Sequence, residues 1–319
     1  MIRQLRIVQT DCTDPHDNLA LEEHLLRTLG ADCCTLYLWQ NRNTVVIGSN
    51  QNAWRECRTE LLEAEGGTLA RRLSGGGAVF HDLGNLNFTF FAPKADYDQT
   101  RQFRVIAQAC RTLGVPAELS GRNDLLAAGR KFSGNAFFHS PTASYHHGTL
   151  LVEADMEKLS RYLRPSAAKL RAKGVESVRS RVVNLRELKP ELTIDALKAA
   201  LAAAFEAEYG MPAAREQAEP APDALREKYH GWAWNYGRKL PFDFSCEDRF
   251  PWGEVQLELA VEGGTVARAS VYTDAMETEA APLLEAALTG CRFTREALCA
   301  AAKACNADVA DLIAKQDIW

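Results

Sequence analysis

The chain of 319 residues lacks a long apolar run and lacks any C-x-x-C pair. Its first residues, MIRQLRIVQTDCTDPHDN, contain no apolar core of a secretory signal, and no window approaches the ~18 to 20 apolar residues of a membrane span. The nine cysteines are scattered, which favours reduced buried thiols over a zinc site or a disulfide framework. We therefore expect a cytoplasmic protein that does not enter a membrane.

An excess of basic residues is also lacking, because 37 Lys and Arg stand against 42 Asp and Glu. The formal charge of -5 argues against a general nucleic-acid binder, which needs a net basic face. Apolar residues make up 46% and charged residues 25%, as in ordinary globular proteins. Single cores seldom grow past ~250 to 300 residues, so we expect a major domain over residues 1–240 and a smaller one over 241–319.

Short apolar runs and amphipathic helices interleave without a strict βαβ rhythm, which predicts an α+β fold with a mixed β-sheet and flanking helices. Asp14 and Pro15 have the pattern of an N-cap and first helical residue, and Thr193 and Gly210 bound an alanine-rich helix. Residues 211–223, MPAAREQAEPAPD, are interpreted as a linker or surface loop. The last part alternates as strands around a glycine turn and closes on two or three helices, which predicts a small α+β unit.

The densest polar feature is RRLSGGGAVFH, which begins at Arg71 and ends at His81. Glycine weakens a strand, so three in succession indicate a bend, or a place where an anion approaches the backbone amides. The motif is neither a Walker loop nor a dinucleotide fingerprint. From the residues alone, a hairpin turn flanked by solvated arginines remains an alternative.

A second polar feature is GRND at 121–124, followed by GRKFSG at 129–134. Lys131 lies between two glycines, where its ammonium could enter a cleft and stabilise carboxylate and phosphate oxygens. Asp124 could help to hold Mg²⁺ and Asn123 could donate to a carbonyl or phosphate. A surface lysine and ordinary turn chemistry are the alternatives for these residues.

A third feature is YHHGTLL, which begins at Tyr145. Adjacent residues of a strand point to opposite faces, so His146 and His147 cannot readily share one metal ion. We expect this pair to line or brace a cleft.

In this order and spacing, RRLSGGGAVFHDLGN, GRNDLLAAGRKFSG and HHGTLL resemble the lipoate-protein ligase A family. The resemblance extends to NLALEEHLL, LWQNRNTVVIGSNQN and LRAKGVESVRSRVVNL, while WAWNYG and RFPWGEVQLELAVEGG resemble the family's accessory domain. It implies the fold shared by biotin ligases and class II aminoacyl-tRNA synthetases. It also implies that ATP activates lipoate or octanoate as an acyl-adenylate. A lysine on a lipoyl domain of an E2 subunit, or on the glycine-cleavage H protein, then accepts the acyl group.

The same resemblance implies roles for individual residues. Lys131 would be the catalytic residue and would touch both substrates, and Asp124 would hold Mg²⁺. The residues implied to bind ATP and the adenylate are Arg72, Gly77, Ala78, Val79, Phe80, Asn123, Asp124 and Lys131. The residues implied to bind lipoate are Arg71, Ser74, Gly75, Gly76, Lys131, His147 and Gly148. The segment LLAAG after Asp124 is shorter than the hairpin of several family members, which could alter lid behaviour.

Three other functions fit the same fold less well. An octanoyltransferase would need a cysteine nucleophile, but no cysteine lies between Gly121 and Leu151, and Cys110 falls in an ordinary amphipathic helix pattern. A noncatalytic lipoate or nucleotide binder has no evident need for Lys131. A tRNA-charging enzyme would need a basic anticodon-binding domain, which the sequence does not suggest.

Overall fold

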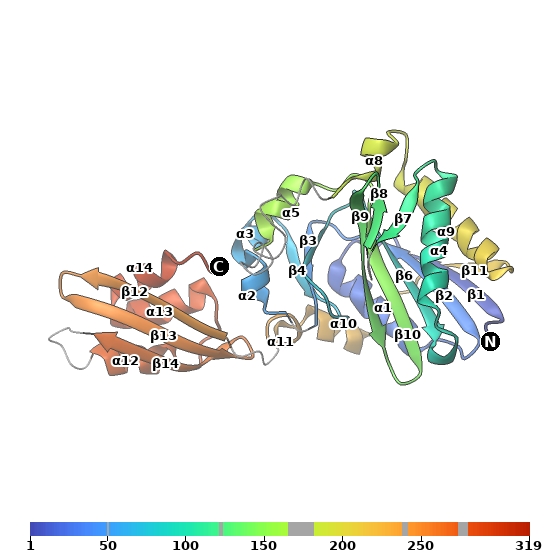
Figure 1. Ribbon diagram of the computed structural model, residues 1–319. Coiled ribbons are helices and arrows are strands. Elements are labelled where there is room, and N and C mark those ends of the chain that lie inside the picture. The colour runs from blue at the N-terminus through green and yellow to red at the C-terminus, as the bar shows by residue number, and fades with distance from the viewer. Residues whose placement is uncertain (50, 121–123, 165–181, 238–241, 274–279) are drawn as a thin grey trace.

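The computed structural model describes residues 1–49, 51–120, 124–164, 182–237, 242–273 and 280–319. A larger unit is built around an eight-stranded sheet, and a smaller C-terminal unit consists of a three-stranded sheet with helices (Figure 1). The predicted α+β class, with a mixed sheet and flanking helices, is confirmed. Among the described residues, no helix combines the length and apolar character needed to cross a membrane.

The large sheet is mixed because β1 pairs in parallel with β11 and β2, while the remaining neighbours are antiparallel. Its order is β11-β1-β2-β6-β10-β9-β8-β7. In that order the strands are Ala213–Gln217, Gln4–Gln9, Cys33–Trp39, Asn85–Pro93, Ala143–Leu151, Arg130–His139, Asp124–Ala127 and Ala117–Ser120. A second sheet of the larger unit, which we call the small sheet, has the order β4-β3-β5, with strands Thr68–Arg71, Thr44–Ile47 and Val79–His81.

Helices cover both faces of the large sheet. On one face, α4 and α9 pack together over a core that includes Phe88, Phe90 and Phe205. On the other face, α1 contacts β6 and β10 and also reaches β4 of the small sheet (Figure 1). The helices of the larger unit are α1 Pro15–Arg27, α2 Ala53–Glu56, α3 Thr59–Ala64, α4 Gln99–Thr112, α5 Met156–Tyr162, α8 Leu185–Leu188, α9 Ile194–Tyr209, α10 Asp223–His230 and α11 Trp232–Asn235, with the 3₁₀ turn η1 at Lys94–Asp96.

The helix boundaries predicted from capping residues are confirmed. The Asp14 carboxylate accepts hydrogen bonds from the backbone amides of His16 and Asp17, and Pro15 is the first residue of α1. The Thr193 hydroxyl accepts from the amide of Ala196, and α9 ends at Gly210 with a φ of 70°.

The linker predicted at 211–223 is wrong, because Ala213–Gln217 forms the edge strand β11 alongside β1. Four of its five residues are exposed, so the strand has no buried face to produce an alternating pattern. Arg6 of β1 and Glu216 of β11 form an ion pair at 2.6 Å. The polar helical pattern of residues 54–65 corresponds to two short helices, α2 and α3. The helical pattern of residues 155–174 begins as α5, and residues 165–181 lie outside the described part of the chain.

The C-terminal unit has the predicted strands, with a turn at Gly263 and Gly264 whose φ angles are 60° and 74°. Its elements are β12 Phe242–Phe250, β13 Gly253–Glu262, β14 Thr265–Thr273, α12 Ala280–Leu288, α13 Arg295–Cys305 and α14 Ala307–Ala314. The unit contacts the larger one through the rings of Trp54 and Phe293, 5.1 Å apart, and through an ion pair of Arg295 with Glu60 at 3.0 Å. The boundary at 240 stays a prediction, since 238–241 lie outside the described residues.

Candidate active site

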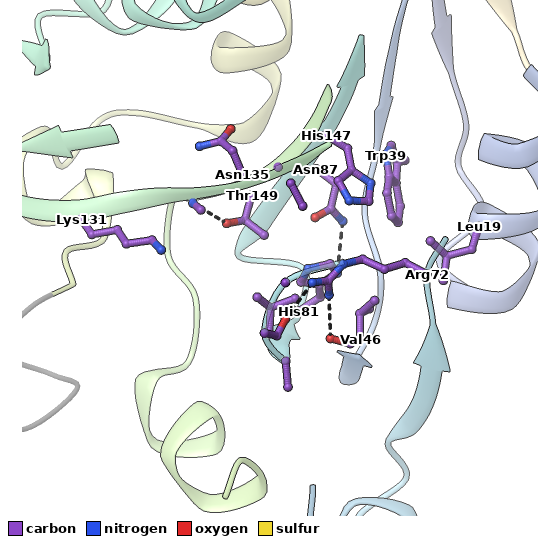
Figure 2. A pocket seen from close by; sticks show the side chains of 17 residues that line it. Leu19, Trp39, Val46, Arg72, His81, Asn87, Lys131, Asn135, His147 and Thr149 are labelled. Carbon is purple, nitrogen blue, oxygen red and sulfur yellow. Dashed lines mark hydrogen bonds between the residues drawn. The ribbon is translucent and has the colours of Figure 1, made fainter. Parts of the chain in front are cut away.

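A cavity of about 360 Å³ opens between the small sheet, the segment that joins β4 to β5, and strands β9 and β10 (Figure 2). We define its buried part as the inner pocket, lined by Leu19, Trp39, Val46, Arg72, His81, Asn87 and His147. Its more exposed part is the outer pocket, lined by Gly76, Gly77, Ala78, Lys131 and Gly134. The remaining lining residues are Val79, Asn135, Ala136, Gly148 and Thr149.

The three glycines of the sequence motif form the exposed turn between β4 and β5, which we call the glycine loop, residues 75–77. Gly76 has a φ of 91°, a conformation that other residues rarely adopt. A Cβ at Gly48 would lie 2.3 Å from the Gly76 carbonyl oxygen, so the backbones of the two segments are in contact. The amide of Ser49 donates to the carbonyl of Ser74 at 2.9 Å and fixes the same approach. The loop is therefore supported from beneath while its outer face stays open.

Arg72 supports the glycine loop from inside the pocket. Its guanidinium donates to the carbonyls of Gly75 and Gly77, both at 2.8 Å, and to that of Val46 at 3.1 Å. Its Nε donates to the Ser74 hydroxyl at 3.0 Å. Burial lowers the pKa of Arg72 to about 10, so the side chain is still charged at neutral pH. Arg72 thus places a positive charge directly beneath the loop.

Arg71, the last residue of β4, precedes Arg72 and points away from the pocket, as neighbouring residues of an extended chain point to opposite sides. Its guanidinium donates to the carbonyls of Gly48 at 3.0 Å and Gln51 at 2.7 Å, and to those of Trp234 and Asn235 at 3.0 and 2.7 Å. Arg71 is 1% exposed and does not line the cavity. In this structure the Arg71 side chain connects Gly48, Ser49 and Gln51 to α11.

His147 lies in a chain of buried hydrogen bonds at the inner pocket. Its Nδ1 is 2.8 Å from the Glu22 carboxylate, so that nitrogen donates, and its Nε2 is 2.7 Å from the Ser74 hydroxyl. Glu22 also accepts from the Thr89 hydroxyl at 2.7 Å, which in turn accepts from the indole of Trp39 at 3.1 Å. This chain connects helix α1, the inner pocket and the residue before the glycine loop.

His81 presents a single donor in the inner pocket. Amide nitrogens of Asn41 and Asn87 lie 3.2 and 3.4 Å from its Nδ1, so Nδ1 accepts and the hydrogen is on Nε2. Among the described residues that nitrogen has no hydrogen-bond partner. Burial, and secondarily the charge of Arg72, lowers the pKa of His81 to about 3. The imidazole is therefore a neutral donor at physiological pH.

Lys131 lies across the pocket from Trp39 and Leu19 (Figure 2). Its ammonium is 2.7 Å from the Asp124 carboxylate, and each side chain is 36% exposed. A Cβ at Gly134 would be 3.0 Å from the Lys131 Nζ, so this glycine leaves room for the lysine chain on β9. The arrangement places a solvent-accessible cation at the outer pocket.

The two adjacent histidines of β10 point to opposite faces, as predicted. His146 lies in the core beneath α4, where its Nδ1 is 3.2 Å from the Gln102 amide oxygen and its Nε2 is 2.9 Å from that of Asn135. Gly148 packs closely against β9 and β6, because a Cβ there would be 2.6 Å from the Asn135 side-chain oxygen and 2.8 Å from the Phe88 ring. Only His147 of the pair therefore faces the cavity.

The structure brings together most of the residues selected from the sequence. Those that line the cavity are Arg72, Gly76, Gly77, Ala78, Val79, Lys131, His147 and Gly148, while Arg71, Ser74, Gly75, Phe80 and Asp124 do not. Phe80 packs on Tyr162, with the ring centroids 5.6 Å apart, and Asn123 lies outside the described residues. The residues not selected individually are Leu19, Glu22, Trp39, Val46, His81, Asn87, Gly134, Asn135, Ala136 and Thr149. Leu19, Glu22 and Trp39 fall in NLALEE and LWQN, segments whose pattern is otherwise that of an ordinary core helix and strand.

Comparisons with known proteins place the chain in the class of ligases that attach lipoate to proteins. Residues 14–206 match the lipoyl protein ligase A/B catalytic domain, and residues 239–318 match the bacterial lipoate protein ligase C-terminus. The chain belongs to the lipoyl protein ligase A/B family.

Individual relatives agree with this assignment. A lipoate-protein ligase A of Psychrobacter cryohalolentis is 43% identical over 304 residues, which cover 92% of this chain and 90% of the relative. A bipartite lipoate protein ligase of Thermoplasma acidophilum, studied with its E2 lipoyl domain, matches with 27% identity and a TM-score of 0.66 over 73% of this chain and 96% of the other. A lipoate-protein ligase A bound with ATP matches with 27% identity and a TM-score of 0.63, over 74% and 99%.

Proposed function

We propose that this chain activates lipoate with ATP as lipoyl-AMP and transfers the lipoyl group to a lysine amine on a lipoyl domain. Family membership and the 43% identical lipoate-protein ligase A support this activity. The observation that carries the proposal is one cavity with a buried inner pocket at one end and the Lys131 cation at the other. Such a cavity suits an apolar chain that ends in a carboxylate.

The inner pocket binds the hydrocarbon tail and the dithiolane ring. Leu19, Trp39 and Val46 are each less than 5% exposed, and each methylene removed from water contributes about 0.8 kcal/mol. An octanoyl chain would use the same walls. The neutral N–H of His81 is a donor that a plain octanoyl chain cannot satisfy, which favours a tail with sulfur acceptors.

Lys131 acts where negative charge develops. In the first step a carboxylate oxygen bonds to the α-phosphorus as the bond from that phosphorus to the bridging oxygen breaks, and pyrophosphate leaves. In the second step the amine of the carrier-domain lysine bonds to the acyl carbon and loses a proton. AMP leaves with the electrons of the broken C–O bond. The ammonium lowers both barriers by stabilising charge on phosphoryl and acyl oxygens more in the transition state than in the ground state.

The glycine loop binds the phosphates in this proposal. Its residues are exposed, Gly76 and Gly77 line the pocket, and amide groups of consecutive residues in a turn can form a concave anion site. Arg72 fixes the carbonyls of Gly75 and Gly77 on the inner side and adds positive charge beneath them. The α-phosphate of the transferred adenylyl group would thus meet the loop amides on one side and Lys131 on another.

The proposal includes Mg²⁺ and two kinds of carrier. Asp124 supplies a carboxylate beside Lys131, and Mg²⁺ commonly uses one or two carboxylates together with substrate phosphates, so the residues present fit the ion. When bound, it would neutralise charge on the pyrophosphate. The proposed carriers are lipoyl domains of E2 subunits, as for the ligase of Thermoplasma acidophilum, and also the glycine-cleavage H protein. We place the reaction in the cytoplasm.

Intact-mass spectrometry of an apo lipoyl domain, incubated with the protein, lipoate and Mg-ATP, tests this function. We expect an ATP-dependent lipoyl mass increase with release of pyrophosphate. Lys131→Ala should lower the rate roughly 10²- to 10³-fold, as when a transition-state donor is removed. Lys303→Ala, a change at an exposed lysine of α13, should leave the rate unchanged.

Two other outcomes would point to the rival functions. A mass increase from an acyl thioester donor without ATP would support an acyltransferase, although the thiol of Cys110 is buried and its pKa is raised to about 12. Tight lipoate binding without pyrophosphate release would support a noncatalytic binder.

A further inference from the structure

A group of potential metal ligands lies outside the pocket, where the start of α1 meets the end of α10. The Asp14 Oδ1 is 3.9 Å from the His16 Nδ1 and 3.9 Å from the His230 Nε2. The three donor atoms all lie within 4.8 Å of one another, and the two imidazole centroids are 4.8 Å apart. Segments more than 200 residues apart in sequence thus bring one carboxylate and two imidazoles together.

The hydrogen bond of His16 leaves its second ring nitrogen facing Asp14. The His16 Nε2 lies 3.0 Å from the Leu69 carbonyl oxygen, which can only accept, so Nε2 donates and Nδ1 carries the lone pair of the neutral ring. That Nδ1 is 3.9 Å from Asp14 Oδ1, which also accepts from the backbone amides of His16 and Asp17 as the N-cap of α1. A ligating histidine whose other nitrogen donates to a backbone carbonyl is the usual arrangement at metal sites.

The distances require only a small adjustment. Zn²⁺ binds nitrogen and oxygen at ~2.0 to 2.2 Å in a tetrahedron, which puts neighbouring ligand atoms roughly 3.3 to 3.5 Å apart. The His230 side chain is 45% exposed, so its ring can turn by the remaining distance. Its Nε2 now donates to Asp17 Oδ1 at 3.0 Å, a bond that a metal ion would replace. Asp17 also pairs with Arg226 at 3.0 Å, which keeps its carboxylate beside the site.

We propose that Asp14, His16 and His230 bind a divalent transition-metal ion, best matched by Zn²⁺, at a structural site separate from the ligase pocket. The ion would connect the N-cap of α1 to the last residue of α10. Only Gly231 separates His230 from α11, whose Trp234 and Asn235 carbonyls accept from Arg71. The bound ion would therefore fix the segment that precedes the C-terminal unit.

Titration of the metal-free full-length protein with Co²⁺, followed by displacement with Zn²⁺, tests the site. We expect one equivalent to bind with visible d–d absorption and without sulfur-to-cobalt charge transfer, since the ligands are nitrogen and oxygen. His230→Asn should weaken binding roughly tenfold or more. His24→Asn, which removes another histidine of α1, should bind as the unsubstituted protein does, as should Cys12→Ser.

Thermal unfolding supplies a second measurement that does not depend on absorption. Zn²⁺ should raise the Tm of the unsubstituted protein and of His24→Asn, but not that of His230→Asn, because an ion that binds only the folded state stabilises it. His16→Gln should behave like His230→Asn. Equal affinity in His230→Asn, a sulfur charge-transfer band, or no binding at micromolar metal would each overturn the proposal.

Discussion

The inner and outer pockets differ in how far their polar groups already have protein partners. In the inner pocket, Arg72 donates to three carbonyls and a hydroxyl, and His147 is held between Glu22 and Ser74. In the outer pocket, the ammonium of Lys131 has one ion-pair partner among the described residues, the partly exposed carboxylate of Asp124. The difference indicates that the inner pocket contributes a preformed shape, whereas the outer pocket keeps its charge available for substrates.

The largest effect that would test this comparison is the loss of stability in Arg72→Ala. The substitution removes four hydrogen bonds of a charged donor, and it leaves the buried carbonyl of Val46 unsatisfied at a cost of ~1 to 3 kcal/mol. We expect the free energy of unfolding to fall by about 3 kcal/mol or more in urea titrations. Arg111→Ala, at an exposed arginine of α4, should change it by less than ~0.5 kcal/mol. Equal losses in the two variants would show that the inner pocket is not preformed by Arg72.

A second test uses the buried neutral imidazole of His81. Its folded pKa of about 3 is below the unfolded value near 6.5, so between these values only the unfolded chain binds the proton. The free energy of unfolding is therefore unaffected by protonation of His81 above pH 6.5. It falls as the pH falls below that value, by at most ~1.4 kcal/mol per pH unit. Lowering the pH from 6.5 to 5 should therefore cost about 2 kcal/mol more in the unsubstituted protein than in His81→Gln. Parallel urea-unfolding profiles for the two proteins at these pH values would contradict the assignment.

The smallest effect is expected in the outer pocket, at Asp124→Asn. The Lys131–Asp124 pair is 36% exposed on each side, so its loss should change the unfolding free energy by less than ~1 kcal/mol. If Asp124 helps to hold Mg²⁺, the Mg²⁺ concentration for half-maximal pyrophosphate release should rise several-fold. An unchanged Mg²⁺ requirement would limit Asp124 to positioning Lys131. Glu118→Gln on the exposed face of β7 is the matched control.

The sequence located the pocket but did not determine which side chains face it. The glycine loop and Lys131 could be selected because their residue types are unusual in strands. Arg71 and Arg72 could not be told apart, since neighbouring strand residues point to opposite faces and the pattern does not say which face carries the ligand. Trp39 and His81 have the pattern of core residues, and they are core residues that also line the cavity.

The edge strand β11 was missed for a related reason. Its residues are mostly exposed, so its position depends on backbone pairing with β1, which leaves no hydrophobic signal in the sequence. The caps of α1 and α9 were predictable because Asp14 and Thr193 act through local hydrogen bonds to amides two or three residues away.

The contacts of Arg71 have a mechanical consequence. A single guanidinium joins the carbonyls of Gly48, Ser49 and Gln51 to those of Trp234 and Asn235, only a few residues before the C-terminal unit begins. Force applied to the C-terminal unit along the chain is therefore delivered to the end of β4, four residues before the glycine loop. The end of β4 therefore carries both the Arg71 contacts to α11 and the segment that leads into the glycine loop, so a displacement of one would displace the other.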